Sequence, residues 1–371
     1  MNIDQHGDMK VQGVSLRGLP KVSLHDHLDG GVRPATILEL AAEANLPTPA
    51  KDAGALRGWL DQQADSGSLV EYLKSFDLVT AVLQTEQALT RVAREFVADL
   101  AEDGVIYGEV RWAPEQHVAG GLSLDQAVRA VQRGIEEGED AADAAGQNIR
   151  VGQILSAMRQ ADRSKEIAEL AVAYRERGVV GFDIAGPEDG FPASDHRAAF
   201  DYLAAEFLPV TVHAGEAAGP ASIRSALIDG RALRLGHGVR IAEDLQIIER
   251  EGDEVQVQFG DLARWVRDRE IPLELSPSSN LHTGASAVWG DELADHPFDL
   301  LYQLGFAVTV NVDNRTMSGT SLTRELALLV DTFGYDLDDL EAFQFNAASA
   351  AFLPVEEREE LVEMIAEGFE R

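Results

Sequence analysis

The sequence predicts an α/β fold, a single-domain (β/α)₈ barrel of the TIM type with a helical insertion after its first strand. Eight short apolar runs with strand-like composition recur along the chain. Amphipathic stretches, in which apolar residues return at helical spacing, separate these runs. Regular alternation of strands and helices is typical of parallel β/α units, and eight such units are the number that closes a barrel.

The predicted elements follow one another over nearly the whole chain. We expect the strands at 21–25, 104–111, 150–157, 179–185, 208–213, 233–237, 271–275 and 306–312. Helices are expected in the stretches between them, among these 85–102, 164–177 and 355–369. Because parallel strands of a barrel end at the same rim, the residues at their carboxyl ends are the first candidates for a functional site.

Nothing in the sequence divides the 371 residues into separate folding units, because it has no internal repeat, low-complexity tract or linker. Barrels of this class commonly use more than about 250 residues as one domain. We expect residues 1–18 to be a flexible lead-in and 19–371 to form the barrel domain. Two segments exceed a minimal barrel: 35–85, the predicted helical insertion, and 241–270, a long charged connection.

The composition excludes several classes of protein. The chain contains no cysteine, which removes disulfides and thiolate metal sites and fits a reducing cytoplasm. Its net charge of −33 would repel a nucleic-acid backbone. No run of about 18 uncharged apolar residues is present, and the N-terminus lacks the features of a secretion signal. We therefore expect a cytoplasmic protein that binds neither nucleic acid nor a membrane; the sequence does not give its oligomeric state.

Histidines and carboxylates gather at the carboxyl ends of the predicted strands. The segment KVSLHDHLDGG places His25 and His27 on the same face of the first strand. The fifth strand ends in His213, the sixth in His237 and the eighth in Asp313. Imidazoles together with a carboxylate can hold Zn²⁺ and leave one position for water, which is the arrangement of a hydrolytic metal site. The fourth strand offers no lysine to bridge two ions, so we expect one metal ion per chain.

Glu216 has two interpretations from the residues alone. It follows His213 by three positions in VHAGEAAGP, where a helix could begin, and an acid is favoured near the positive end of a helix. In a metal-assisted hydrolase the same carboxyl group could act as a general acid or base. Spacing alone leaves both interpretations open.

Six short motifs occur in the order and at the spacing found in the adenosine deaminases. They are HDHLDG, VGFDIAGPE, VHAGE, RLGHG, SPSSN and the segment 312–323, which reads VDNRTMSGTSLT. The motifs extend from about residue 19 to the C-terminal helix. The chain therefore resembles this family of metal-dependent, amidohydrolase-type barrels over nearly its whole length.

The resemblance implies hydrolytic deamination of adenosine, and of 2′-deoxyadenosine, to inosine and ammonia by a zinc-bound hydroxide that attacks purine C6. It implies one Zn²⁺ per chain, held by His25, His27, His213 and Asp313. Glu216 would be the proton donor to purine N1. His237 would lie beside the metal-bound water, helping to take its proton and to stabilise the developing alkoxide. Asp313 would also orient the hydroxide.

The resemblance also implies contacts around the substrate, with His27 facing it as well as the metal. Gly186 would contact purine N3 through its backbone N–H, and Asp29 would hydrogen-bond the ribose 5′-hydroxyl. Asn314 departs from the family pattern, which has an aspartate there, but its amide can donate to purine N7 at any pH. Three residues of the insertion, Tyr72, Leu73 and Phe76, are similar to the family's apolar lid over the sugar, although helix packing would explain them equally well.

Substrate choice within the superfamily has alternatives. Adenine-specific relatives tend to carry glutamate where this chain has Asp29, and the shorter side chain leaves room for a sugar hydroxyl. We therefore expect a purine nucleoside as the small-molecule substrate. A deaminase of adenine or of a modified adenosine, and a non-catalytic purine-binding homologue, are the alternatives. Ser23, where many relatives have an acid, points to the ligand face and receives no assigned role.

Overall fold

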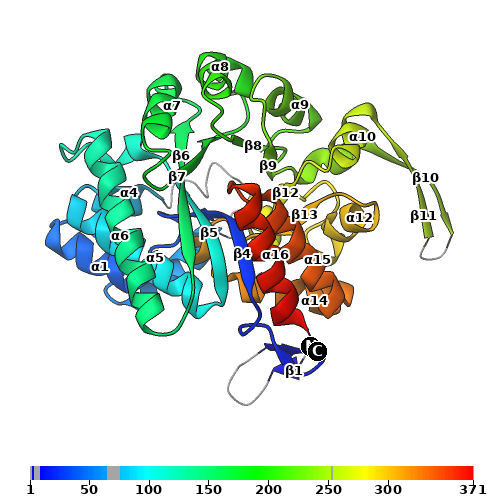
Figure 1. Ribbon diagram of the computed structural model, residues 1–371, viewed down its shortest axis with the longest axis horizontal. Helices are drawn as coiled ribbons and strands as arrows, with labels where there is room; N and C mark the ends of the chain where they lie inside the picture. The colour runs from blue at the N-terminus through cyan, green and yellow to red at the C-terminus, as the bar shows by residue number, and fades with distance from the viewer. Residues whose placement is uncertain (1, 4–8, 65–75, 252–253, 371) are drawn as a thin grey trace.

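The computed structural model describes residues 2–3, 9–64, 76–251 and 254–370 (Figure 1). Eight parallel strands form two four-stranded sheets, ordered β4-β5-β6-β7 and β8-β9-β12-β13. Their bounds are β4 (Lys21–His27), β5 (Val105–Trp112), β6 (Arg150–Met158), β7 (Val179–Ala185), β8 (Thr211–Ala214), β9 (Arg234–His237), β12 (Leu273–Leu275) and β13 (Val308–Val310). Each overlaps the strand that the sequence predicts at that place.

The two sheets join at both edges, so that the strands follow one another around a barrel in chain order. At one seam the Phe182 N–H donates to Pro209 O at 3.0 Å, and a parallel bridge pairs Phe182 with Val210. At the other seam the His27 N–H donates to Asp313 O at 2.7 Å. The predicted (β/α)₈ barrel is therefore confirmed.

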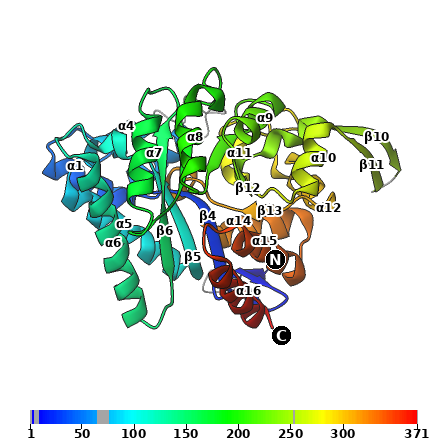
Figure 2. The ribbon, with the colours of Figure 1, turned by 45° about the horizontal axis from the view of Figure 1, so that its top comes forward.

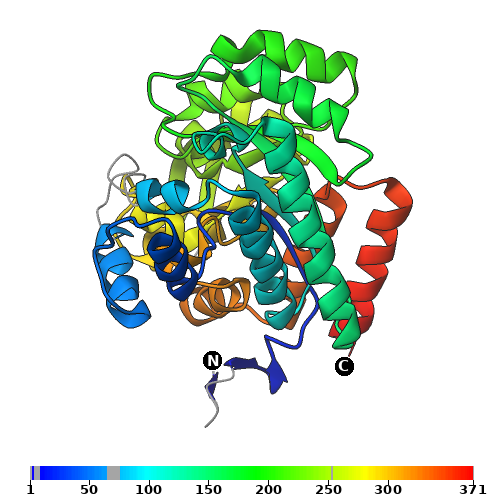
Figure 3. The ribbon, with the colours of Figure 1, turned by 90° about the vertical axis from the view of Figure 1, so that its left-hand side faces the viewer.

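Helices cover the outside of the strands (Figure 3). The longer ones are α5 (Glu86–Glu102), α6 (Leu124–Ala144), α7 (Ser164–Ala173), α8 (Arg197–Ala205), α9 (Pro220–Ile228), α10 (Asp261–Asp268), α14 (Leu322–Phe333), α15 (Leu337–Ala350) and α16 (Val355–Phe369). Shorter helices are α11 (Pro277–His282), α12 (Phe298–Gln303) and α13 (Arg315–Ser318). Short 3₁₀ helices lie at η1 (Pro114–His117), η2 (Ala193–His196), η3 (Val239–Asp244) and η4 (Leu293–Asp295). Among the helices of the described residues, none has the length and apolar character that a membrane span requires.

The helical insertion lies between β4 and β5, as predicted. It contains α1 (Pro34–Glu43), α2 (Ala53–Ala64) and α4 (Phe76–Val82). Two of the predicted lid residues, Tyr72 and Leu73, lie outside the described residues. The insertion leaves the barrel at the carboxyl end of β4, which is the rim where the predicted site residues gather.

A two-stranded hairpin and a small three-stranded sheet, both antiparallel, lie outside the barrel and were not predicted. The segment 241–270, expected only as a charged connection, contains the hairpin β10 (Leu245–Glu251) and β11 (Glu254–Phe259). The hairpin projects from the body of the molecule in Figures 1 and 2. Near the N-terminus, β1 (Asn2–Ile3), β2 (Met9–Val11) and β3 (Val14–Ser15) form a small sheet. The boundary after residue 18 and the flexibility of the lead-in stay predictions.

Two glycines allow α5 and α6 to pack closely on the outside of the barrel. Gly134 and Gly138 are one helical turn apart on α6 and are both buried. A Cβ at Gly134 would overlap Thr90 O, and a Cβ at Gly138 would lie 2.6 Å from Val97 Cβ. Larger side chains would therefore push the two helices apart.

We expect Gly134→Ala to lower the free energy of unfolding by about 1–3 kcal/mol, because the added methyl group overpacks this contact. Gly58→Ala is the matched control: Gly58 is exposed on α2, and a Cβ there would meet nothing within 4 Å. Alanine should stabilise that helix by about 0.5–1 kcal/mol. Calorimetric melting temperatures of both variants test this. Equal shifts in the same direction would show that α5 and α6 do not need the close approach.

Candidate metal centre and active site

The side chains predicted from the strand ends meet at one rim of the barrel, around a cavity of about 920 Å³. Its walls include His27, Asp29, Phe76, Gly186, His213, Glu216, His237, Asp313 and Asn314. His25 is fully buried beside them, with its ring centroid 4.6 Å from that of His213. The carboxyl rim of such a barrel is where loops and strand ends can supply convergent polar groups.

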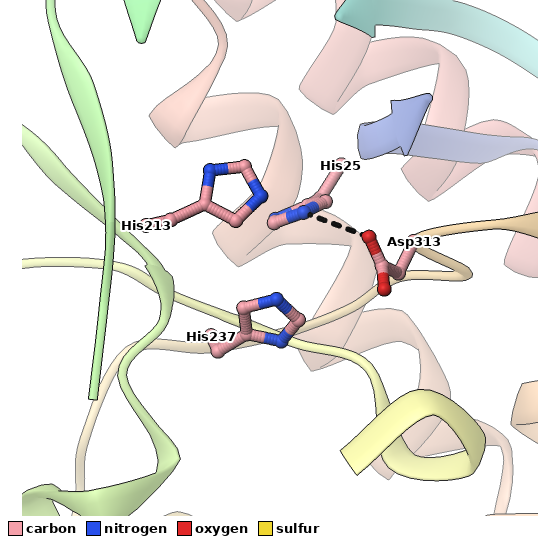
Figure 4. Close-up of side chains that lie close together, drawn as sticks. All are labelled: His25, His213, His237 and Asp313. Atoms are coloured by element: carbon pink, nitrogen blue, oxygen red, sulfur yellow. Dashed lines mark ion pairs between the residues drawn. The ribbon is translucent and has the colours of Figure 1, made fainter. Parts of the chain in front are cut away.

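Five side chains converge on one point, and Figure 4 shows four of them. Ligand atoms of His25, His213, His237 and Asp313 all lie within 4.8 Å of one another. His27 joins them, because its Nε2 lies 3.2 Å from His213 Nε2 and 3.3 Å from Asp313 Oδ1. Segments that are far apart in the sequence thus bring imidazoles and a carboxylate together only in the folded barrel.

This donor set fits a transition-metal ion. His25 Nε2 is buried and makes no hydrogen bond of good geometry, although it lies 3.3 Å from Asp313 Oδ1. Burial lowers the pKa of His25 and, together with nearby positive charge, holds that of His213 well below its usual range. Both imidazoles are therefore neutral, which is the form that binds metal ions. Although burial disfavours its charge, the rings of His25 and His27, each with Nε2 3.3 Å from Oδ1, hold the pKa of Asp313 well below the ordinary value. Neutral imidazoles around an ionised carboxylate suit Zn²⁺ and related ions.

Two buried carboxylates orient the imidazoles toward the centre. Glu274 Oε2 lies 3.0 Å from His25 Nδ1, and Asp183 Oδ2 lies 2.8 Å from His213 Nδ1. The hydrogen bond of His25 Nδ1 with the Glu274 carboxylate holds the His25 ring proton there and leaves its Nε2 lone pair facing the other ligands, whereas His213 Nδ1 faces Asp183 without a hydrogen bond of good geometry. Both rings are therefore already turned in the direction that metal binding requires.

Glu274 is also the centre of an ionic network inside the barrel. Its Oε2 accepts a hydrogen bond from Arg111 and its Oε1 accepts one from Arg234, both at 2.7 Å. Arg234 pairs in turn with Glu109. Although burial opposes ionisation, the two arginines hold the pKa of Glu274 well below its usual range. Glu274 is thus charged at neutral pH and can polarise the imidazole of His25.

Glu216 lies in the turn between β8 and α9, and its environment keeps it protonated. Burial, with the charges of Asp313 and Glu188, raises its pKa to about 8. The helix α9 begins only at Pro220, so Glu216 is not an acid of the first helical turn. Its Oε2 lies 3.6 Å from His237 Nε2. The structure therefore argues against the helix-start interpretation of Glu216, and its role as a general acid stays a prediction.

Glu188 holds the turn that carries Glu216. Its carboxylate accepts the backbone N–H groups of four successive residues at 2.7–3.0 Å, those of Gly215, Glu216, Ala217 and Ala218. A carboxylate with four donors has little need of further partners. It fixes the position of Glu216 while adding a negative charge that disfavours a second one nearby.

The backbone is left-handed at three positions around the cavity. His237 has φ 62° and Asp313 has φ 58°, values that residues other than glycine rarely adopt. Such conformations persist when the surrounding structure holds them, and they are common in active sites. Gly186 has φ 100°, and a Cβ there would lie 2.7 Å from Gln160 Oε1. Glycine lets the main chain itself form this part of the wall.

The remaining predicted residues have clear positions. Asp29 and Phe76 line the cavity, and the Asp29 carboxylate accepts the Gly30 N–H at 3.1 Å. Gly30 leaves room for Asn314, since a Cβ on residue 30 would overlap Asn314 Oδ1. Ser23 is fully buried and its hydroxyl oxygen has no hydrogen-bond partner, so nothing in the structure gives it a role at the site.

The supporting residues that were not nominated from the sequence include Asp183, Glu274, Ser279 and Asn280. Ser279 donates to Asp313 Oδ2 at 2.6 Å, and Asn280 Nδ2 lies 2.9 Å from His237 Nδ1. A usable signal was present for the two acids. Each stands inside an otherwise apolar strand, VGFDIA or PLELS, and an acid is rarely buried without a partner.

An eight-stranded parallel barrel with buried imidazoles and a carboxylate at its carboxyl rim defines the class of metal-dependent hydrolase barrels. The comparison with protein families specifies the class further. The sequence model of the adenosine deaminase family matches residues 20–368. The chain therefore belongs to the adenosine deaminase family.

Individual relatives agree with this assignment. The chain is 55% identical to adenosine deaminase 1 of Streptomyces coelicolor, with 92% of this chain and 85% of the relative covered. It is 51% identical to the adenosine deaminase of Mycobacteroides abscessus, with 93% of each covered. Among solved structures, the N6-mAMP deaminase of Arabidopsis is 28% identical with a TM-score of 0.78, over 95% of this chain and 99% of the other.

We expect Glu274→Gln to lower the free energy of unfolding by about 3–5 kcal/mol, because it leaves two buried arginines short of a charge partner. Glu102→Gln is the control, since Glu102 is exposed and pairs with Arg17 at 3.4 Å; its effect should stay below about 1 kcal/mol. The depressed pKa of Glu274 makes its contribution fully present above the ordinary glutamate pKa of 4.5. The difference between wild type and Glu274→Gln should therefore shrink as the pH falls below that value. Thermal unfolding between neutral and acidic pH tests this, and a difference that grew on acidification would contradict it.

Proposed function

We propose that the chain catalyses the hydrolytic deamination of adenosine, and of 2′-deoxyadenosine, to inosine and ammonia. One observation carries the proposal: a buried, protonated Glu216 faces the same cavity as the cluster of imidazoles and Asp313. A purine in this cavity would meet a proton donor and a hydrolytic centre together. Relatives that are 51–55% identical and named adenosine deaminase support the choice of substrate.

We propose one Zn²⁺ per chain, held by His25, His27, His213 and Asp313. When bound, the ion would supply Lewis acidity that lowers the pKa of a water molecule toward neutrality. His237 is the fifth member of the cluster, and we assign it to the reacting oxygen because its Nε2 faces Glu216. Asp313 would help to orient the attacking water.

Glu216 would donate its proton to purine N1 while the water oxygen adds to C6. The protonated ring is the better electrophile, since the positive charge at N1 draws electrons from C6. Of the two protons that the water loses, one would leave with the amino group as ammonia and the other would return Glu216 to its protonated form, which completes the exchange of one water for one ammonia. The raised pKa of Glu216 supports this role because it keeps the carboxyl group protonated at neutral pH.

The rest of the cavity would bind the nucleoside. Gly186 would donate its N–H to purine N3, and the Asn314 amide would donate to N7. Asp29 would accept a hydrogen bond from the ribose 5′-hydroxyl. His27 would contact the substrate beside the metal, and the apolar cover of the sugar is assigned to Tyr72, Leu73 and Phe76, of which the structure describes Phe76 at the cavity wall.

The charge of the cavity supports a nucleoside rather than a nucleotide. The described residues that line it include no lysine or arginine, whereas Asp29 and Asp77 are both present. A phosphate group would therefore meet negative charge and no cationic partner among these residues. We also propose a cytoplasmic location, which the absence of cysteine supports, and no nucleic-acid or membrane partner.

Purified, zinc-loaded protein should convert adenosine and 2′-deoxyadenosine with kcat/KM at least about a hundredfold above that for adenine or AMP, because only the nucleosides satisfy Asp29 without adding charge. The loss of adenosine absorbance on conversion to inosine measures this, and prior treatment with a chelator should abolish it. Preferred turnover of adenine or of a modified adenosine would keep the reaction type but replace adenosine as the assigned substrate. Failure to deaminate any purine with one metal ion bound per chain would exclude the proposed reaction.

Glu216→Gln should lower kcat by about 10²–10⁴, since the amide cannot give a proton to N1, while the metal content stays unchanged. Glu139→Gln is a matched control, because burial also raises the pKa of Glu139. Glu139 is on α6, and its carboxyl group accepts a hydrogen bond from the Val151 N–H at 2.7 Å. The activity of this variant should equal that of the wild type. In the wild type, kcat/KM should fall as the pH rises past about 8, where Glu216 loses its proton. Near-normal turnover by metal-replete Glu216→Gln would refute the assignment.

A further inference from the structure

A chain of buried hydrogen bonds leads from the first turn of α12 to His237. The backbone N–H of Phe298 donates to His296 Nδ1 at 3.0 Å. His296 Nε2 lies 3.2 Å from Asn280 Oδ1, and Asn280 Nδ2 lies 2.9 Å from His237 Nδ1. The three side chains from His296 to His237 are at most 3% exposed. Water therefore does not compete for these bonds.

The direction of the chain is determined at its far end, because a backbone N–H can only donate. His296 Nδ1 must be the accepting nitrogen, so a neutral His296 carries its single proton on Nε2. That proton points at Asn280, which has to present Oδ1 to it, since two N–H groups would repel each other. Asn280 then turns its NH₂ group toward His237. Each step follows from the one before, starting at the main chain.

Burial keeps His296 in the neutral form that this direction requires. It lowers the pKa of His296 to about 3, far below neutral pH. A doubly protonated ring would also place two donors, Phe298 N–H and Nδ1–H, against each other. The chain therefore has one arrangement of protons at working pH.

The last hydrogen bond of the series runs from the Asn280 amide to His237 Nδ1. Because Nδ1 accepts a hydrogen bond from Asn280, the proton of a neutral His237 is on Nε2. That nitrogen faces the cavity, 3.6 Å from Glu216 Oε2. A ring nitrogen that already carries a proton cannot take another from the attacking water. Of the two roles that the family resemblance gave His237, removal of that proton and stabilisation of the developing alkoxide, only the second is open to this tautomer.

We propose that His296 is a positioning residue which, through Asn280, holds His237 in the Nε2–H tautomer, so that His237 donates a hydrogen bond to the oxygen that adds to purine C6. This inference rests on the proposed function. The role is a hydrogen bond, and His237 transfers no proton in it. A donor that is oriented before the reaction stabilises the negative charge that develops on that oxygen.

Local structure alone does not call for an imidazole at position 296. The Phe298 N–H belongs to the first turn of α12, where any short polar side chain could accept it. Histidine differs from such caps because it accepts on one edge of a rigid ring and donates from the other. That property is needed only if the residue that accepts from the Phe298 N–H must also donate a hydrogen bond to Asn280.

The first test uses the wild-type holoenzyme loaded with diamagnetic zinc and labelled with ¹⁵N in its histidine rings. Protonated and unprotonated ring nitrogens have well-separated ¹⁵N shifts, and the His237 signals are assigned by their absence from His237→Gln. We expect a protonated Nε2 and an unprotonated Nδ1 in His237. The reverse pattern would overturn the proposal. Because the tautomer is measured in the wild-type protein, the result does not depend on whether variants of Asn280 or His296 fold.

The second test uses an isosteric substitution to reverse the direction of the hydrogen bond between residue 280 and His237. Asn280→Asp faces His237 Nδ1 with a carboxylate oxygen, which should draw the ring proton to Nδ1 and exchange the two ¹⁵N signatures. We expect kcat for adenosine to fall about 10- to 100-fold with KM nearly unchanged. Asn346→Asp is the matched control. Asn346 is on α15, away from the cavity, and its Nδ2 donates a hydrogen bond to Val308 O at 2.9 Å. This variant should leave kcat and the His237 signals as in the wild type.

Substitution of His296 separates relay from packing. His296→Phe should lower kcat to a similar extent as Asn280→Asp, and His296→Gln, which offers both an acceptor and a donor, should restore part of it. Unchanged kcat and ¹⁵N shifts in a folded His296→Phe protein would overturn the proposal. A holoenzyme that shows the expected tautomer but deaminates no purine would instead refute the proposed function and leave the tautomer assignment standing.

Discussion

The buried carboxylate of Glu274 is the constraint on which the interior of the barrel depends. A charge without water must be surrounded by partners, and here these are Arg111, Arg234, His25 and the hydroxyl of Thr211. The partners come from β5, β9, β4 and β8, while Glu274 itself is on β12. One charge therefore links five strands and turns His25 Nε2 toward the cavity at the same time. The folding of the barrel and the orientation of the metal centre are consequences of the same ionic network.

A second consequence of burial is that two carboxyl groups in one cavity have opposite protonation states. Burial and the charges of Asp313 and Glu188 raise the pKa of Glu216, whereas the adjacent rings of His25 and His27 hold that of Asp313 low despite its burial. The ionised group is the one beside the imidazoles. The protonated group is the one beside other acids. Environments that separate two pKa values in this way allow one site to bind a cation and to donate a proton.

The strands and the residues at their ends could be predicted because both depend on local signals. Alternating strands and helices place all carboxyl ends at one rim, so His25, His213 and Asp313 could be brought together without knowing any side-chain contact. The partners of these residues could not be predicted, because the neighbours of Glu274 depend on which strands face one another across the barrel. The hairpin β10–β11 was missed because charges interrupt its apolar alternation, as in LQIIERE. His296 lies in a connection with no periodic pattern, and its proximity to Asn280 exists only in the folded chain.

Backbone groups give the site proton positions that side chains alone could not guarantee. The turn before α9 presents four N–H groups to Glu188, and the Asp183 carboxylate accepts the His213 N–H at 3.2 Å. The first turn of α12 presents the Phe298 N–H to His296. A main-chain N–H cannot exchange its role as donor for that of acceptor, whereas an imidazole or an amide can. The first turn of α12 and the turn between β8 and α9 leave such donors without partners in a helix or strand. The connections that follow the strands therefore supply fixed donors next to the cavity, and the proton arrangement of the site follows from them.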